Sequence, residues 1–382
     1  MPLNWARALL LTAVTMVACS APAPTPLPAT TPAATAPSGP IAWHATSAAP
    51  ISTRVGHSAV WSGEELLVWG GEPFSTLAAD DAAGVAYRPE TDEWRVLPVP
   101  PIANRSSHVA ASTGTEMLIW GGVNRGNLLS DGAAYAPEAD LWRTLPEAPL
   151  LGGAGYLSAW TGSEWLIVEA GSEANPDANS GRGAAYNPAK DRWRALPVAP
   201  LPPGWAATGT WTGSLFVIVR IGAEGPFGGA QYDPANDEWT PIPGNPALVE
   251  SSTYPFATWT GDEVLLARDV IQTSAGVEEG TAAWAYDPST SEWSEKAPPP
   301  IGLGYGPPAV IGDHVVFYAP NGRQGWVCRP SLDTWLPLPR IDDRDREFWS
   351  ATAVLSAVIV WGGSNPPGEA GSEGIIIEVP GS

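Results

Sequence analysis

A repeated spacing between tyrosine and tryptophan constrains the fold of this 382-residue chain more than any other feature. The first copy runs from Gly84 to Pro89, contains Tyr87, and is followed by Trp94 seven residues after the tyrosine. Six segments share this pattern, and their tryptophans lie 48, 51, 46, 54 and 42 residues apart. Repeats of this length with alternating apolar residues predict an all-β fold built from blades of four strands each.

Three residue columns follow the repeat, and we expect all three to be structural. A buried tryptophan removes up to about 250 Å² from water, so one per blade is best explained by packing between blades. Asp or Ser in the turn before each tryptophan is typical of a turn whose side chain caps backbone donors. The tyrosine column is Tyr87, Tyr135, Tyr186, Tyr232 and Tyr286, with Cys328 as the sixth member. The tryptophan column is Trp43, Trp94, Trp142, Trp193, Trp239, Trp293 and Trp335.

The strands of the first blade can be placed from the apolar pattern and the turn residues. We predict a first strand at Gly56–Trp61 and a second at Leu66–Trp69, which ends in Gly70-Gly71. The third strand is predicted around Val85–Tyr87 and the fourth at Trp94–Leu97. Proline-rich crossings then lead to the next blade, where no donor is needed for a strand ladder.

The two ends of the chain together predict a seventh blade. The C-terminal part supplies three strands, at Phe348–Val354, Val358–Trp361 and Ile375–Glu378, but no tryptophan follows them. Near the other end, Ala42–Ala45 contains Trp43 and has the character of an isolated fourth strand. Pairing these segments closes the ring and leaves no open sheet edge between the first and last blades.

These motifs together resemble the kelch repeat, whose pattern is a hydrophobic run, a double glycine, then Tyr-x-Pro and Trp. The tyrosine–tryptophan half matches in all six segments, whereas the double glycine occurs only at Gly70, Gly121 and Gly362. The resemblance covers residues 41–382 and implies a seven-bladed kelch-type β-propeller, similar to the galactose-oxidase-like proteins. Kelch-type copper oxidases need a tyrosine cross-linked to a cysteine, and Cys328 replaces the tyrosine of its own column, so we do not expect that activity.

The first forty residues resemble a bacterial lipoprotein leader followed by a tether. Residues 1–19 read as a signal peptide whose last residues, Met16 to Cys19, are similar to a lipobox, with Cys19 as the lipidated residue. An ordinary secretion signal is the alternative. Residues 20–40 are almost wholly Ala, Pro, Thr and Ser and cannot build a core. We therefore expect a protein anchored in the cell envelope, facing away from the cytoplasm and touching the membrane only through its lipid.

The composition excludes several classes of partner. A net charge of −21 disfavours nucleic acid, because phosphate binding needs clustered positive charge. The chain has two cysteines, Cys19 at the end of the predicted leader and Cys328 in the repeat region, so we expect no disulfide framework. Only His57 and His108 occupy matched positions, which is too few ligands for a metal, so we expect neither metal nor cofactor. We expect a monomer.

Arginine is concentrated where the strand pattern places one mouth of the central channel. Arg54, Arg105 and Arg346 precede first strands, and Arg220 and Arg268 follow second strands. Such a set needs neutralising, either by salt bridges and backbone carbonyls or by a bound carboxylate. Tyr156 and Trp349 occupy the first-strand position of His57 and His108, and they offer aromatic walls for a ligand such as a sugar acid.

Two functions follow from this arrangement. The first is a recognition module without catalysis, which binds a protein or a small anionic or carbohydrate ligand at the mouth. The alternative is a carbohydrate-active enzyme resembling the kelch-type sugar-acid epimerases and mutarotases. In that case Glu169, His57 and His108 would transfer protons while the arginines hold the carboxylate. A carboxylate with a raised pKa beside the arginines would favour the enzyme.

Overall fold

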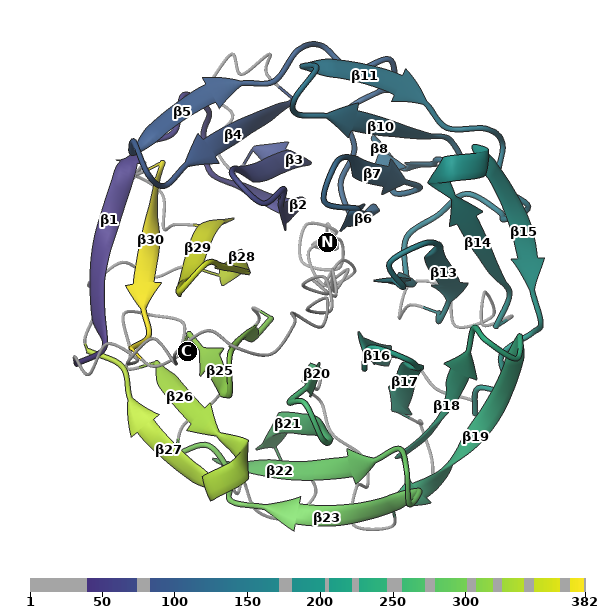
Figure 1. Ribbon diagram of the computed structural model, residues 1–382, viewed down its shortest axis with the longest axis vertical. Helices are drawn as coiled ribbons and strands as arrows, with labels where there is room; N and C mark the ends of the chain where they lie inside the picture. Colours follow the sequence, from purple (N-terminus) through teal and green to yellow (C-terminus); the bar gives the residue numbers. More distant parts are fainter. Residues whose placement is uncertain are drawn as a thin grey trace, which may run out of the picture.

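Seven four-stranded antiparallel sheets form a ring around a central axis (Figure 1). The computed structural model describes residues 40–73, 83–171, 181–202, 206–221, 227–245, 256–271, 279–300, 307–318, 325–339, 347–364 and 372–380. Within blades 1 to 6 the chain runs outward from the innermost strand to the rim, as β2, β3, β4 and β5 do in blade 1. The predicted seven-bladed β-propeller is confirmed.

The strand bounds follow the chain blade by blade. Blade 1 contains β2 (Arg54–Trp61), β3 (Leu66–Pro73), β4 (Gly84–Arg88) and β5 (Glu93–Val96). Blade 2 contains β6 (Val109–Ser112), β7 (Met117–Trp120), β10 (Gly132–Ala136) and β11 (Leu141–Thr144), and a hairpin of β8 (Val123–Asn124) and β9 (Asn127–Leu128) joins β7 to β10. Blade 3 contains β12 (Tyr156–Trp160), β13 (Trp165–Glu169), β14 (Gly183–Asn187) and β15 (Arg192–Leu196). Blade 4 contains β16 (Ala206–Trp211), β17 (Phe216–Ile221), β18 (Phe227–Asp233) and β19 (Glu238–Asn245).

The remaining blades complete the ring. Blade 5 contains β20 (Phe256–Trp259), β21 (Val264–Ile271), β22 (Glu279–Asp287) and β23 (Glu292–Lys296). Blade 6 contains β24 (Ala309–Ile311), β25 (His314–Phe317), β26 (Trp326–Arg329) and β27 (Thr334–Pro337). Blade 7 contains β28 (Glu347–Val354), β29 (Ala357–Ser364), β30 (Glu373–Glu378) and the N-terminal β1 (Ala42–Ala48).

Blade 7 is closed by both ends of the chain, as the orphan strand predicted. β1 pairs antiparallel with β30, and Trp43 lies opposite Ile377. The strand extends to Ala48, three residues beyond the predicted end, past an irregularity in the ladder after Ala45. Inside this joint the amide of Gly374 donates to the Thr46 hydroxyl at 2.8 Å. No sheet edge is left open between blades 7 and 1, which protects the ring from pairing with other chains.

The tryptophan column packs between blades and is hydrogen-bonded there. The Trp142 ring lies 4.9 Å from the Tyr135 ring of its own blade and 6.0 Å from the Trp69 ring of blade 1. Its Nε1 donates to the carbonyl of Pro98, which follows the last strand of blade 1, at 2.9 Å. The same bond to the preceding blade is made by Trp94, Trp193, Trp239, Trp293 and Trp335. This column therefore joins each of these blades to its predecessor.

The aspartate column is structural too, but its partners differ from those expected. Asp140 has a φ of 52°, in the left-handed region that Asp tolerates better than most residues, and its Oδ1 accepts the Tyr135 hydroxyl. Burial and this bond raise the pKa of Tyr135 to about 12, so the phenol stays a donor. Tyr87, Tyr186 and Tyr232 make the same bond within their own blades. The side chain thus holds the tyrosine column. Asp92 and Asp333 also accept a backbone amide, as the sequence suggested, but from Ser47 and Ala297 of the preceding blade rather than from their own turn.

An arginine next to the tryptophan clamps three successive pairs of blades. Arg95 of blade 1 binds Glu65 of its own blade at 2.6 Å and Asp140 of blade 2 at 2.9 Å. Arg143 repeats the arrangement with Glu116 and Asp191. Arg194 repeats it with Glu164 and Asp237. The four other positions that follow a column tryptophan hold His44, Thr240, Ser294 and Leu336, so this clamp joins only blades 1 to 4.

The predicted leader and tether lie outside the described residues, apart from Pro40 at the end of the tether. Residues 1–39, which include Cys19, belong to the part of the chain that the structure does not describe. Among the described residues, no helix has the length and apolar character needed to cross a membrane.

Candidate functional site

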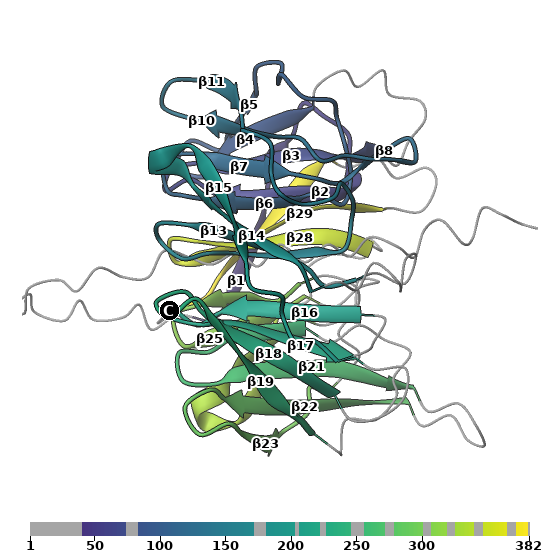
Figure 2. The same cartoon turned by 90° about the vertical axis from the view of Figure 1, so that its right-hand side faces the viewer.

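One end of the ring gathers the segments expected to form a mouth. The loops between second and third strands and the crossings between blades meet at this end, because consecutive strands are antiparallel. The β8–β9 hairpin of blade 2 projects there (Figure 2). The residues predicted to bind a ligand belong to the innermost two strands of the blades and to the crossings at this end.

Arg54 and Arg105 occupy equivalent places in blades 1 and 2, and both side chains are buried. The Arg54 guanidinium donates to the carbonyls of Ser52 and Gly70, at 3.4 and 3.2 Å. Arg105 donates in the same way to Ala103 and Gly121, both at 3.0 Å. Each arginine thus ties a crossing to the end of the second strand in its own blade. These are contacts that hold loops in place.

Arg105 has one further partner at the surface. Its Nη1 forms an ion pair with Asp131 at 2.8 Å, and the Asp131 side chain is half-exposed. The Arg105 side chain itself is completely shielded from solvent. A ligand at this place therefore meets Asp131 and the rim of the loop before it meets the guanidinium of Arg105.

The other predicted arginines are distributed around the ring. Arg220 lies in β17 opposite Ala207 and is fully buried, and burial lowers its pKa to about 10. Arg268 lies in β21 with its backbone opposite Ala282, and Trp349 lies in β28 opposite Gly362. The side chains of Arg268 and Trp349 are outside the described part, as is the whole of Arg346. Among the described side chains, Arg54, Arg105 and Arg220 therefore lie in three different blades and are all buried.

His57 and His108 bind serines of the preceding blade. His57 Nε2 lies 3.0 Å from the Ser350 hydroxyl, and His108 Nε2 lies 2.8 Å from the Ser58 hydroxyl. Each imidazole also stands edge-on to a tryptophan of that blade, His57 to Trp361 and His108 to Trp69. Burial and the neighbouring arginine lower the pKa of His57 to about 4; burial, Arg105 and His57 lower that of His108 to about 3. Both are neutral at pH 7 and serve as joints between blades.

Tyr156 and Glu169 are cross-strand partners in blade 3. The Tyr156 ring stands edge-on to Trp120 of blade 2, with centroids 5.1 Å apart. Its hydroxyl donates to the carbonyl of Leu151, and burial together with the charge of Glu169 raises its pKa. Glu169 is 8% exposed. Tyr156 therefore repeats the inter-blade packing of the two histidines.

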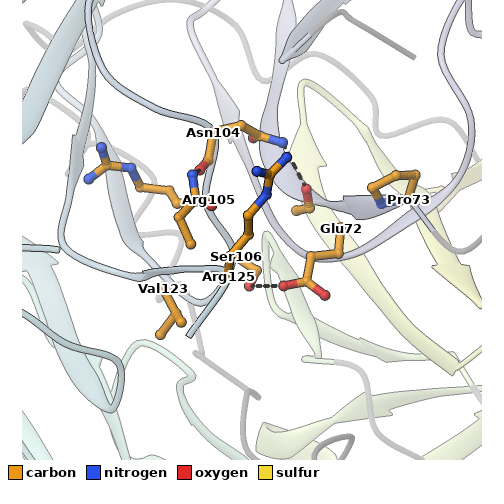
Figure 3. A pocket seen from close by; sticks show the side chains of 9 residues that line it. Glu72, Pro73, Asn104, Arg105, Ser106, Val123 and Arg125 are labelled. Carbon is orange, nitrogen blue, oxygen red and sulfur yellow. Dashed lines mark hydrogen bonds between the residues drawn. The ribbon is translucent and has the colours of Figure 1, made fainter. Parts of the chain in front are cut away.

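A hollow of about 620 Å³ lies between blades 1 and 2 at the mouth (Figure 3). This is within the range of about 300–1,000 Å³ that is typical of small-molecule sites. Its walls are the end of β3, the crossing before β6 and the β8–β9 hairpin, and they expose Glu72, Asn104, Ser106 and Arg125. The Ser106 hydroxyl donates to Glu72 at 3.1 Å. Sequence reasoning found Arg105 here but missed the other four residues, because the repeat pattern defines no residue at the end of β3, in the crossing or in the hairpin.

The walls of this hollow are held by backbone bonds. Ser106 and Val123 exchange two hydrogen bonds, at 3.0 and 2.9 Å. The Asn124 amide donates to the Asn104 carbonyl at 2.7 Å, and the Asn104 amide donates to the Gly71 carbonyl at 3.3 Å. The crossing and the hairpin are thus linked into one frame, so the exposed polar groups are presented from fixed backbone.

Within the described ranges, no group of three or more His, Cys, Asp or Glu side chains is close enough to hold an ion. Cys328 is buried in β26 opposite Trp335, and burial raises the pKa of its thiol to about 12. Its environment is that of a core residue.

Comparison with known proteins supports the fold and goes no further. No protein-family model and no curated protein sequence matches the chain. The chain is similar to the solved structure of YjhT, with a TM-score of 0.52 and 12% sequence identity over 87% of this chain and 97% of that one. At so low an identity, the likeness shows that the two chains share the β-propeller fold.

Proposed function

We propose that this protein is a kelch-like lipoprotein of the bacterial cell envelope that recognises an anionic or carbohydrate ligand at the mouth of its propeller. The observation that carries the proposal is the polar hollow between blades 1 and 2, whose size suits a small molecule. Its exposed groups are a guanidinium, a carboxylate, a hydroxyl and amides, which can hydrogen-bond a hydroxylated or charged ligand.

The geometry favours binding over proton transfer. An acid–base catalyst needs a titratable group near neutral pH that can reach the substrate. His57 and His108 have pKa values far below neutrality, and their Nε2 atoms are hydrogen-bonded to serines of the neighbouring blade. Glu169 is almost completely buried. Of the three residues proposed for the alternative sugar-acid epimerase or mutarotase, the two histidines are thus occupied in joints between blades, and Glu169 is shielded by its burial.

A thermal-shift screen tests the recognition role. The full-length protein is heated with uronic acids, neutral sugars, amino sugars and amino acids, each at millimolar concentration. A bound ligand raises the melting temperature because it binds the folded state and not the unfolded chain. We expect at least one class to stabilise the protein, and the shift to vanish in Asn104→Ala. If no class changes the melting temperature, a small-molecule recognition role is wrong.

Fractionation tests the anchor separately. Lipidation of Cys19 should place the protein in the membrane fraction, because lipid chains supply hydrophobic area that inserts into the bilayer. Cys19→Ser should move it to the soluble fraction. An unchanged distribution would contradict lipidation and leave the ligand screen unaffected.

A further inference from the structure

The hollow between blades 1 and 2 contains two opposite charges that do not pair with each other. Arg125 and Glu72 both line it, yet they form no ion pair or hydrogen bond together. On this same face, Arg105 does pair with the nearby Asp131. Opposite charges that share one hollow without neutralising each other leave room for a ligand that carries both complementary groups.

Arg125 has the properties of a side chain kept for a ligand. It is exposed, and within the described residues its guanidinium makes no hydrogen bond or ion pair. It stands at the tip of the β8–β9 hairpin with a φ of 48°, next to Gly126 at 81°. A two-residue turn of this kind prefers Asn before Gly, so arginine here adopts an unfavourable backbone conformation. Residues other than Gly, Asn or Asp that are held in this conformation are more common at functional sites.

Glu72 provides the other end of the hollow. One carboxylate oxygen accepts the Ser106 hydroxyl at 3.1 Å, which fixes the orientation of the group. The other oxygen has no hydrogen-bond partner in the described part of the chain. An ionised carboxylate accepts about four hydrogen bonds, so Glu72 can still receive hydroxyl or ammonium donors from a ligand.

We propose that this hollow binds a small carboxylate that carries hydrogen-bond donors on neighbouring atoms. Arg125 binds the ligand carboxylate through its planar fork, and Glu72 receives the adjacent hydroxyl or ammonium groups. Hydroxylated sugar acids and free amino acids share this chemistry. The proposal rests on the recognition role given above and adds the chemical class of the ligand and the residues that select it.

Titration calorimetry on the full-length protein tests the assignment. The probes are glucuronate and glutamate. Glucose is the comparison that lacks the carboxylate of glucuronate, and acetate is the comparison that has a carboxylate without neighbouring donors. We expect glucuronate or glutamate to bind, and glucose and acetate to bind at least about tenfold more weakly. The tighter binder of glucuronate and glutamate shows whether the ligand is a sugar acid or a free amino acid. A charge-assisted hydrogen bond is worth roughly tenfold or more in affinity.

Three variants locate the site. Arg125→Ala should weaken the carboxylate ligand at least about tenfold, and Glu72→Gln should weaken it while leaving acetate unchanged. Arg192→Ala is the matched control, because Arg192 is also exposed and lies in β15 near the turn at the opposite end of its blade. Equal loss in Arg125→Ala and Arg192→Ala would overturn the assigned site.

The outcomes separate this proposal from the broader one. Binding of glucose as tight as that of glucuronate, unaffected by Arg125→Ala, would overturn the carboxylate class and leave the recognition role standing. Failure of every compound in the thermal-shift screen would overturn the recognition role itself. Because Arg125 and Glu72 are exposed, their variants should keep the melting temperature of the unsubstituted protein, which checks that they fold.

Discussion

The imidazole of His108 occupies the space that a side chain on Gly70 would need. A Cβ built on Gly70 would stand 2.6 Å from His108 Cε1 and 2.7 Å from the carbonyl oxygen of Arg105. Gly362 and His57 repeat the relationship between blades 7 and 1, with 2.4 Å between the corresponding atoms. The first glycine of the double glycine in blades 7 and 1 therefore makes room for a histidine ring of the next blade, whereas at Gly121 of blade 2 an added Cβ would meet the carbonyl oxygen of Gly153.

Replacing Gly70 by alanine should destabilise the fold by more than about 3 kcal/mol. The substitution combines overpacking against His108 with a φ of 74°, which alanine disfavours. Gly114→Ala is the control: it has a φ of 89° with no atom within 4 Å of the added Cβ, so it carries the backbone strain without the clash and should cost about 1–2 kcal/mol. Urea unfolding measures both, and equal costs would show that the His108 contact is unimportant.

Removing Arg95 should weaken the joint between blades 1 and 2 by about 1–2 kcal/mol. Burial alone would raise the pKa of Glu65, but the bonds from Arg95 and Arg88 hold it below its usual range. Arg95→Ala leaves this nearly buried carboxylate with Arg88 alone, although the exposure of Arg95 to solvent limits the loss. A double-mutant cycle with Asp140→Asn should give a coupling energy of at least about 0.5 kcal/mol, and a coupling of zero would exclude the clamp.

The stability of the fold should fall between about pH 6.5 and pH 5, partly through His108. Its pKa is about 3 in the folded protein and near 6.5 in an unfolded chain, so unfolding takes up a proton in this window. The free energy of unfolding therefore rises with pH, by up to about 1.4 kcal/mol per unit for this one group. His108→Gln should reduce that slope by about one proton in urea titrations at several pH values. An unchanged slope would mean that His108 is charged in the folded ring.

Changing Trp142 to phenylalanine should separate its hydrogen bond from its packing. The variant keeps an aromatic ring against Tyr135 and Trp69 but loses the Nε1 bond to Pro98, so we expect a loss of about 1–2 kcal/mol. Trp142→Ala should cost about 3–5 kcal/mol because it also leaves a cavity. Chemical denaturation gives both values, and similar costs for the two variants would show that packing contributes little.

The repeat made the blades predictable because the residues of each column make the same contacts in successive blades. Trp94 and its equivalents need a hydrophobic slot and a carbonyl of the preceding blade, and both recur with the repeat. The closing strand was predictable for the same reason, since Trp43 stood alone without the strands that should precede it. What the repeat could not predict was the inter-blade role of Asp140, because its tyrosine and arginine partners lie on different blades.

The candidate site was predictable only in part. The arginine pattern pointed to the end of the ring where Arg54 and Arg105 lie, but whether a guanidinium faces a ligand depends on carbonyls that turn toward it, as those of Gly70 and Gly121 do. Backbone acceptors leave no mark in a sequence. Arg125 did carry a signal, because Arg125-Gly126 stands between Val123-Asn124 and Asn127-Leu128, where a tight hairpin forms.

The joint between β1 and β30 also determines when the ring can close during synthesis of the chain. Thr46 and Gly374 are bonded partners although 328 positions separate them. At roughly 5–20 residues per second, the ribosome needs tens of seconds to deliver the second after the first. During that interval β1 is present but β30, the strand it pairs with, is not yet made. The ring is then an open arc with two exposed edges. A chaperone or a secretion channel that keeps the chain extended would act in this window, and a truncated product would never leave it.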